Sequence, residues 1–409
     1  MNFIAVIVLV ALGVDFLLNL SADLLNLKHL SPELPHTFRD TYDKKRYADS
    51  QRYLKANTYF EWCVSVVNLL ALLFFWFFGG FNWLDHFARG FDRGPVLTGI
   101  IFISLLILLK TIVDMPFGIY STFVIEEKFG FNKTSWKTYL LDRVKGLLLS
   151  IILGLPLLGG VLAFFEYAGQ NAWWYCWAVI ILFSLLVRYI GPTWIMPLFN
   201  KFSPLEDGDL KNALMSLAER IHFPLTNVFL MDGSRRSTKS NAFFTGFGKN
   251  KRIVLFDTLV EETSTDELVA VLAHEMGHYK LRHIWVNTLI GMFHTGFLFF
   301  LLSVFIALEP LFEAFFMDSP SVYGGIIFFG MLYSPVEFFI GILMQFHSRH
   351  NEFQADRFAV EKTGKPKALA SALKKLSIHN LSNLTPHPFY VVMNYSHPPL
   401  QKRIQAMMR

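Results

Sequence analysis

Charged residues and cysteines are scarce in this sequence. Asp, Glu, Lys and Arg make up 17% of the 409 residues, whereas an ordinary soluble domain carries about 25%. Cys63 and Cys176 are the only two cysteines, which excludes a disulfide framework and a cysteine-based metal site. Hydrophobic residues account for 53% of the chain, and 43 positions are phenylalanine. This composition predicts a protein with much of its surface facing lipid.

Seven segments are apolar and long enough to span a bilayer, which takes roughly 20 residues each. They lie near 3–20, 61–80, 96–115, 146–165, 173–196, 286–308 and 324–346. The first has no basic residue before it and no small-residue cleavage site after it, so we expect a retained span. Lys110, Asp114 and Arg188 fall within or beside spans, where charges are expected to face water or one another.

Lysine and arginine are unevenly distributed between the loops. Segments 21–60, 116–145, 197–285 and 347–409 carry 7, 5, 11 and 10 of them, and the alternate loops 81–95, 166–172 and 309–323 carry 2, 0 and 0. Cytoplasmic loops accumulate Lys and Arg, so we place the first group inside, the N-terminus outside and the C-terminus inside. The net charge of +5 then reports membrane orientation, and no nucleic-acid partner is expected.

The spans suggest four parts of the chain: helices 1–5 with two inner loops (1–196), a polar insertion (197–285), helices 6 and 7 (286–346) and a helical C-terminal segment (347–409). Inside the insertion, the pattern predicts a helix over 209–221 and β-rich runs at 226–231, 241–247 and 252–256. Ser264 and Glu267 form a capping-box pattern ahead of a helix that extends to about Arg282. We therefore expect a mostly α, polytopic membrane protein whose inner domain holds a small β-ribbon.

The capped helix carries the sequence His274-Glu275-Met276-Gly277-His278. Positions i and i+4 share one helix face, so both imidazoles can reach one metal ion. Glu275 is turned about 100° away and can accept a proton from a metal-activated water. This pattern predicts a zinc site with hydrolytic chemistry, holding one zinc per chain.

A catalytic zinc needs a third protein ligand and an open position. Glu352 and Asp356 are i and i+4 on a predicted helix after the last span, so one carboxylate can bind metal while the other accepts the N–H of a ligating imidazole. Taken alone, the pair is more typical of a solvated helix face. His347 and His350 are alternative ligands by their spacing.

Several further segments occur in a fixed order around these residues: Ser240-Asn241-Ala242-Phe243-Phe244, Lys251 to Leu259, His274 to His278, Glu352 to Asp356, and His397-Pro398-Pro399-Leu400. Together they resemble the type I CAAX prenyl endopeptidases, a family of seven-span membrane metalloproteases. The resemblance extends over nearly the whole chain and is densest from 234 to 283. It implies a gluzincin-type metalloprotease domain at the inner membrane face.

The resemblance also implies roles for individual residues. His274, His278 and Glu352 match the family's zinc ligands, Glu275 its general base and acid, and Asp356 the carboxylate behind a ligating histidine. His397 and Arg403 match residues lining the site, with His397 donating to the oxyanion. By itself, His397 is a loop histidine before two prolines, and Arg403 suits a snorkelling helix residue or a partner for a substrate carboxylate.

The run Asn241–Phe247 is similar to the family's edge strand beside the metal. A peptide substrate would add there as a further strand, contacting Asn241, Ala242 and Phe243. The alternative interpretation of Asn241 is a turn residue that opens a strand.

The resemblance implies cleavage after the cysteine of a C-terminal Cys-aliphatic-aliphatic-any motif, usually prenylated. The short 309–323 loop and the residues His350 and Asn351 before Glu352 favour a bacterial relative in the inner membrane. Its clients would be other membrane or membrane-associated polypeptides, which makes membrane-protein quality control the expected role. A eukaryotic member would lie in the endoplasmic reticulum membrane. A transporter or translocation-associated protein with a structural zinc is the alternative from another class, although it has no need of Glu275. A third interpretation, a zinc peptidase that acts on soluble peptides, differs from the membrane endopeptidase in its substrate alone.

Overall fold

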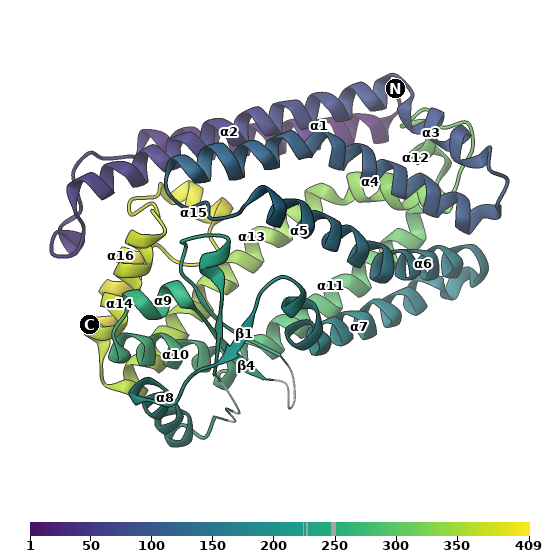
Figure 1. Cartoon of the computed structure of the whole chain (residues 1–409). Coiled ribbons are helices and arrows are strands. Elements are labelled where there is room, and N and C mark those ends of the chain that lie inside the picture. Colours follow the sequence, from purple (N-terminus) through teal and green to yellow (C-terminus); the bar gives the residue numbers. More distant parts are fainter. Residues whose placement is uncertain (224, 226–227, 247–250) are drawn as a thin grey trace.

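Seven long apolar helices run through the protein, and all seven predicted spans are confirmed (Figure 1). The computed structural model describes residues 1–223, 225, 228–246 and 251–409. Four spans are single helices: Phe3–Lys28 (α1), Lys44–Phe77 (α2), His283–Phe305 (α11) and Val322–Thr363 (α13). The span Gly94–Glu126 consists of α4 (Gly94–Tyr120) and the π-helical η2 (Ser121–Glu126), and the span Trp136–Tyr167 consists of α5 (Trp136–Leu149), η3 (Ser150–Gly154) and α6 (Leu155–Tyr167). The span Gly169–Leu198 is chiefly α7 (Ala172–Ile190).

The helices extend beyond the apolar segments that predicted them. α2 begins at Lys44 rather than near 61, and α13 continues to Thr363, well past 346. Hydropathy marks where the lipid ends, whereas a helix ends where its backbone is capped. For α13 that point is Gly364, which has a left-handed φ of 67° and bonds back to the carbonyl of Val360. Glu352 and Asp356 therefore lie on the part of α13 that continues beyond the apolar, membrane-spanning segment.

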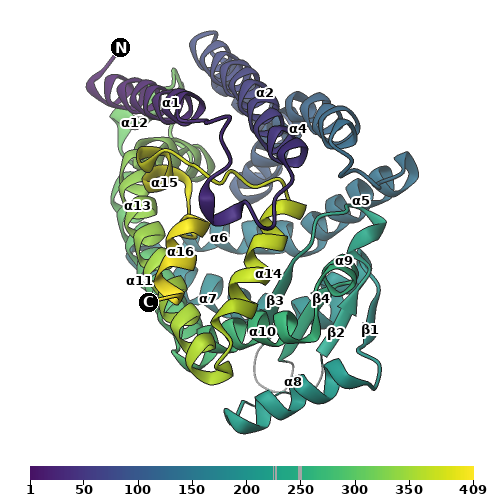
Figure 2. The same cartoon turned by 90° about the vertical axis from the view of Figure 1, so that its left-hand side faces the viewer.

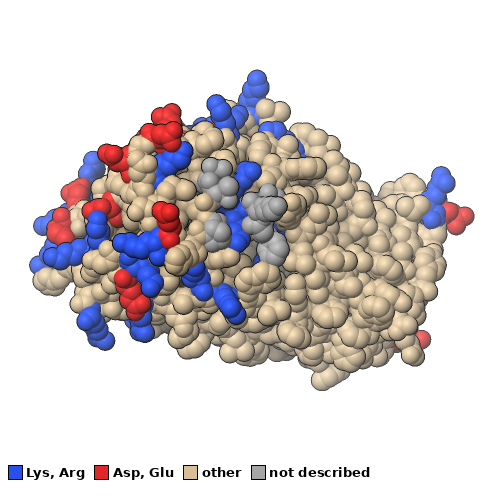
Figure 3. All heavy atoms as spheres, turned by 90° about the horizontal axis from the view of Figure 1, so that it is seen from below, with Lys and Arg blue, Asp and Glu red and all other residues tan. Residues whose placement is uncertain are grey.

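The surface of the spans suits a lipid environment. In the most apolar stretch of 18 residues of each span, only 6–22% of the residues are buried within the protein. In Figure 3 the charged side chains gather at one end of the molecule, a broad uncharged surface follows, and a few charges mark the far end. The N- and C-termini lie at opposite ends in Figure 1, as an odd number of spans requires.

The few charges within spans have partners. Lys110 pairs with Asp114 one helical turn away, and Arg188 donates to Thr288 at 2.5 Å. Lys110 also lines a cavity of about 710 Å³ between α1, α2, α4 and α13. The Lys110–Asp114 pair confirms the expectation that charges within spans face one another or water, whereas Arg188 contacts a neutral hydroxyl. Cys63 and Cys176 are both free, as expected.

Two short helices that the sequence did not predict, α3 (Gly80–Arg89) and α12 (Glu309–Glu313), close the N-terminal end of the bundle. Between them lies an aromatic core in which Trp76 stacks on Phe315 at 4.5 Å and Phe315 on Phe328 at 4.2 Å between ring centroids. Such stacked pairs add to the free energy gained by burying their apolar area.

The other end holds a mixed four-stranded sheet in the order β1-β2-β4-β3. Its strands are Phe202–Pro204 (β1), Val228–Met231 (β2), Ala242–Thr245 (β3) and Arg252–Phe256 (β4), with β2 and β4 parallel and the other pairs antiparallel. The three predicted β runs are confirmed where they are described; positions 226, 227 and 247 lie outside the described residues. The strand β1 was not predicted, because it is only three residues long and ends in proline. The structure therefore has a four-stranded sheet where a small β-ribbon was expected.

Six shorter helices lie at the same end of the protein as this sheet: Asp209–Arg220 (α8), Asp257–Glu262 (α9), Thr265–Lys280 (α10), Pro366–His379 (α14), Pro388–Asn394 (α15) and Leu400–Met407 (α16). α8 confirms the helix predicted over 209–221. Figure 2 shows α10 between the sheet on one side and α13, α14 and α16 on the other, and α10 contacts β3, α13 and α14.

Residues 236–239, which precede β3, are bound to the membrane helices by hydrogen bonds and ion pairs. Arg236 holds Asp142 of α5 through two bonds of 2.8 and 3.0 Å, and Lys239 pairs with Glu126 of η2 at 2.8 Å. The backbone of Lys133 donates to the carbonyl of Arg236 at 3.0 Å. The position of this edge strand is therefore set by the spans themselves.

Candidate metal centre

The centre is built on α10, whose first turn is strongly capped. The Ser264 hydroxyl accepts from the Glu267 backbone N–H at 3.4 Å, and the Glu267 carboxylate accepts from the Ser264 N–H at 2.7 Å, confirming the capping box. The same carboxylate accepts from Ser371 at 2.6 Å and Lys375 at 2.9 Å on α14. Burial acts to raise the pKa of Glu267, but these bonds outweigh it and hold the pKa below its ordinary value.

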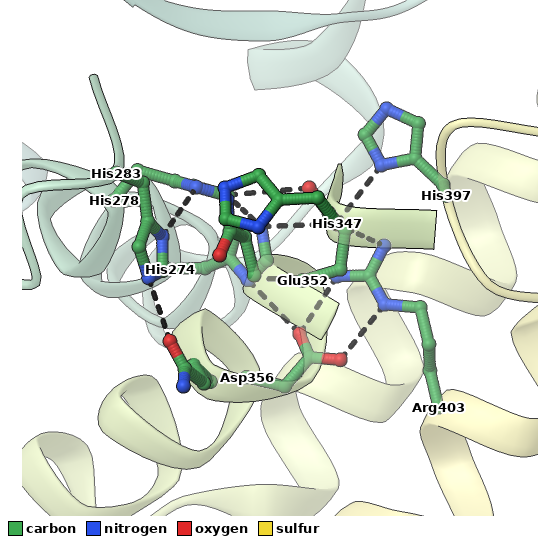
Figure 4. A network of polar contacts seen from close by, with 10 residues as sticks. His274, His278, His283, His347, Glu352, Asp356, His397 and Arg403 are labelled. Atoms are coloured by element: carbon green, nitrogen blue, oxygen red, sulfur yellow. Dashed lines mark hydrogen bonds and ion pairs between the residues drawn. The ribbon is translucent and has the colours of Figure 1, made fainter. Parts of the chain in front are cut away.

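Three side chains from α10 and α13 converge on one point (Figure 4). The Nε2 atoms of His274 and His278 lie 3.2 Å apart. Glu352 Oε1 lies 3.3 Å from His278 Nε2, and Glu352 Oε2 lies 3.5 Å from His274 Nε2. A tetrahedral ion with metal–ligand bonds of about 2.0–2.1 Å separates its ligands by roughly 3.3–3.4 Å. The separation of the two histidine nitrogens is close to this value, and one donor atom from each of the three residues lies within 4.8 Å of the other two, so the cluster has the donors and the approximate size of a zinc site.

The charges around this point also suit a cation. Glu352 Oε2 is buried and accepts no well-aligned hydrogen bond, although nitrogens of Arg403 and His397 lie 3.1 and 2.9 Å away. Burial alone would lower the pKa of His274, but hydrogen bonds to the carboxylates of Asp356 and Glu352 outweigh it and raise its pKa to about 9. The carboxylates that raise this pKa also place negative charge where a cation would bind.

Asp356 orients His274 from behind. Its Oδ1 lies 2.9 Å from His274 Nδ1, which leaves Nε2 facing Glu352. Arg403 of α16 donates to both Asp356 oxygens, at 2.8 and 2.7 Å, and its guanidinium also lies 3.1 Å from Glu352. Carboxylates that hold a ligating histidine in this way fix its tautomer and raise its basicity. The contacts of Arg403 are thus with the two carboxylates, and it is 7% exposed.

His278 has an equivalent support that sequence reasoning missed. Its Nδ1 lies 3.1 Å from Nδ1 of His283, whose Nε2 lies 2.8 Å from Gln354 Oε1. We assign the proton to His278 Nδ1, since that tautomer leaves Nε2 free for metal and lets His283 Nε2–H donate to Gln354. His283 follows the end of α10, where no periodic pattern indicates a partner for His278.

Gly277 allows α10 and α13 to approach closely. A Cβ at this position would lie 3.1 Å from Phe358 Cδ1 and 3.3 Å from Ala355 Cα. The small residues at this crossing bring Glu352, one turn from Ala355, within reach of both histidines. The glycine inside the motif is therefore a packing requirement of the centre.

The remaining predicted residues surround this cluster. Glu275 is half-buried beside His274, and no described side chain makes a hydrogen bond or contact ion pair with its carboxylate. His397 reaches Glu352 through Nδ1, yet its side chain is 64% exposed. Asn241 lies at the start of β3, exposed, and its carbonyl accepts from the Phe256 N–H at 3.1 Å. Ala242 and Phe243 follow it in β3, an edge strand of the sheet that contacts α10.

The two alternative ligands lie outside the described cluster of His274, His278 and Glu352. His347 Nε2 accepts from the amide nitrogen of Asn351 at 3.1 Å, and His350 Nε2 accepts from the amide nitrogen of Gln354 at 3.0 Å. His350 also lines a separate groove near α15. The geometry therefore favours Glu352 as the third ligand.

A two-histidine, one-carboxylate site with an unengaged glutamate beside it is the arrangement of a hydrolytic metal centre. A chain that combines such a site with seven apolar, membrane-spanning helices is an integral-membrane metallopeptidase. Two family models match the chain: the CAAX prenyl protease N-terminal domain with five membrane helices over residues 23–201, and peptidase family M48 over residues 204–409. The chain belongs to peptidase family M48, within its CAAX prenyl protease branch.

Individual relatives align with this chain over nearly their full length. The CAAX prenyl protease 1 homolog of Arabidopsis thaliana is 38% identical over 389 residues, covering 92% of this chain and 90% of that protein. CAAX prenyl protease 1 of Saccharomyces cerevisiae is 37% identical over 402 residues, covering 92% and 88%. The crystal structure of S. mikatae Ste24p is similar with a TM-score of 0.92 at 35% identity, covering 100% of this chain and 99% of that one. The family resemblance seen in the sequence is confirmed, and the transporter alternative loses its support.

Proposed function

We propose that this protein is a zinc endopeptidase that removes the last three residues of polypeptides ending in Cys-aliphatic-aliphatic-any, with a prenylated cysteine as the natural form. The metallopeptidase activity follows from the family; the metal identity and the substrate are the proposal. The cluster of His274, His278 and Glu352 carries it, because two imidazole nitrogens and a carboxylate oxygen gathered within 4.8 Å of one another are donors that suit zinc. The relatives named CAAX prenyl protease 1 support the substrate class.

The residues of the site divide the reaction between them. A zinc ion bound by the three ligands would acidify water and polarise the scissile carbonyl. Glu275 takes the proton of the attacking water and returns it to the leaving amine nitrogen. Asp356 and His283 keep the two imidazoles in the ligating tautomer.

Two further elements would bind the peptide. β3 offers an unpaired strand edge beside α10, where a substrate adds as an extra strand through Asn241, Ala242 and Phe243. His397 is exposed enough to donate to the oxyanion as it forms, a contribution worth about 10²–10³ in rate. Arg403 is buried against Asp356 and Glu352, so we assign it to holding those carboxylates rather than to a substrate carboxylate.

The uneven basic loops support an active site on the cytoplasmic side, with the N-terminus outside. The relatives named above come from eukaryotes, so a bacterial origin and a role in membrane-protein quality control stay predictions from the sequence.

The test is release of the terminal tripeptide from a farnesylated Cys-aliphatic-aliphatic-any peptide by the purified full-length protein with zinc. The same peptide without the farnesyl group and an internal, unprenylated membrane peptide serve as comparisons. We expect release from the farnesylated peptide by wild type and none by Glu275→Gln. Equal cleavage of all three peptides would overturn the substrate class and leave the peptidase intact. Undiminished cleavage by Glu275→Gln would overturn the mechanism.

A further inference from the structure

A groove of about 490 Å³ lies between α13, α15, the segment 398–402 and the end of α1, a volume within the usual range of ligand sites. Two observations place it at the boundary of the lipid. His29, on its wall, is the residue that caps the first span after Lys28. Phe346, which also lines the groove, ends the apolar part of α13 and is 69% exposed.

The charge of the groove is of one sign. Arg349, Lys402, His29 and His350 line it, and no Asp or Glu is among its described lining residues. Two nearby lysines of α14 are paired, in contrast: Lys374 with Asp40 at 3.0 Å and Lys375 with Glu267 at 2.9 Å. Lys402 is exposed, and its side-chain ammonium makes no hydrogen bond or contact ion pair with a described residue. The groove therefore lacks a counterion of its own.

Arg349 is held in position for a ligand. Its Nη1 donates to the carbonyls of Val391 at 3.2 Å and Tyr395 at 2.5 Å, which fixes the guanidinium against the end of α15. Its Nε and Nη2 groups bond to none of the described residues and stay available. A fixed guanidinium with free N–H groups is suited to phosphate oxygens.

We propose that this groove binds the headgroup of an anionic phospholipid. The phosphate accepts hydrogen bonds from Arg349 and Lys402, and an acyl chain follows the exposed ring of Phe346 toward the lipid-facing side of α13. A cationic groove between membrane helices, without a carboxylate and open at the lipid boundary, is the arrangement that recognises such headgroups.

The groove shares a wall with the metal centre. Pro398 and Pro399 line it, and the residue before them, His397, contacts Glu352 at 2.9 Å. A bound headgroup therefore packs behind the segment that presents His397 and Arg403. This consequence rests on the proposed function, whereas lipid binding itself does not.

The test uses the full-length protein in phosphatidylcholine vesicles containing trace spin-labelled lipid. Electron spin resonance measures the motionally restricted fraction of spin-labelled phosphatidylglycerol relative to spin-labelled phosphatidylcholine. We expect wild type to prefer phosphatidylglycerol, and Lys402→Gln to lower that preference about fivefold, the factor expected for one basic residue at an anionic surface. Lys367→Gln, an exposed lysine on α14 away from the groove, is the matched control and should behave as wild type.

Three results would overturn the proposal. Equal association of the two lipids with wild type would show that the groove has no anionic preference. An equal loss in Lys402→Gln and Lys367→Gln would assign any preference to net charge alone. Displacement of the spin-labelled phosphatidylglycerol by millimolar inorganic phosphate would identify a soluble-anion site in place of a lipid site. None of these readouts depends on peptide cleavage, so they separate from a failure of the proposed function.

Discussion

Arg403 and Asp356 form a buried two-bond ion pair, with Nε and Nη2 of the guanidinium 2.8 and 2.7 Å from the two carboxylate oxygens. The same guanidinium lies 3.1 Å from Glu352. One cation thus neutralises the carboxylate behind His274 and a carboxylate of the ligand triangle. It links the last helix of the chain to the geometry of the metal centre.

Arg403→Gln removes that cation from beside two buried carboxylates and breaks the two-bond pair with Asp356. We expect a loss of about 3–5 kcal/mol in the free energy of unfolding, as for other broken buried pairs. Thermal unfolding of the zinc-loaded protein measures it, with Arg357→Gln, an exposed arginine on α13, as the control. A variant as stable as Arg357→Gln would contradict the assigned role.

Gly277→Val places a branched side chain where a Cβ already lies 3.1 Å from Phe358 Cδ1. The helices α10 and α13 must then separate, so we expect a loss of about 1–3 kcal/mol in stability together with weaker zinc binding. Equilibrium zinc titration against a competing chelator measures the second effect. Gly146→Val, at a helical glycine with no atom within 4 Å of its Cβ, should change neither.

His283→Phe removes the acceptor of the His278 Nδ1–H while retaining a ring of similar size. The loss of such a partner typically weakens metal binding by about 10–100-fold. His283→Asn, whose side-chain oxygen can accept the same proton, should recover part of the affinity. If both variants bound zinc as tightly as wild type, His283 would have no part in orienting His278.

Stability at acid pH should depend on Glu267. The pKa of Glu267 is lower in the folded protein than in the unfolded chain, so the unfolded state binds the extra proton as pH falls. Its contribution is complete above the unfolded pKa of about 4.3 and is lost as pH falls through the lower, folded value. Melting temperatures of wild type and Glu267→Gln should therefore differ at neutral pH and converge below about pH 4. A constant difference across this range would contradict the assignment.

The spans and the motif helix could be predicted because each depends on a local pattern. Hydropathy identified seven spans, and the Ser264–Glu267 capping box with the i, i+4 histidines identified α10. The parallel pairing of β2 with β4 and the short strand β1 could not be predicted, since both depend on partners distant in sequence.

The supports of the site were harder to predict than its ligands. Glu352 and Asp356 follow helical spacing, but only the crossing at Gly277 shows that they face His274 and His278. His283 lies beyond the end of α10, and its link to Gln354 bridges two helices. Arg403 was predicted at the site through a family resemblance, whereas its bonds to Asp356 and Glu352 are visible only in three dimensions.

The most direct test of the metal centre is the zinc content of the purified protein, measured by mass spectrometry of the metal after dialysis against dilute chelator. We expect one zinc per chain in wild type and in Glu275→Gln, with peptide cleavage in wild type alone, and a much reduced zinc content in Glu352→Gln. Full zinc and full cleavage in Glu352→Gln would contradict the ligand triangle, and His347 and His350 would then be the next ligands to test.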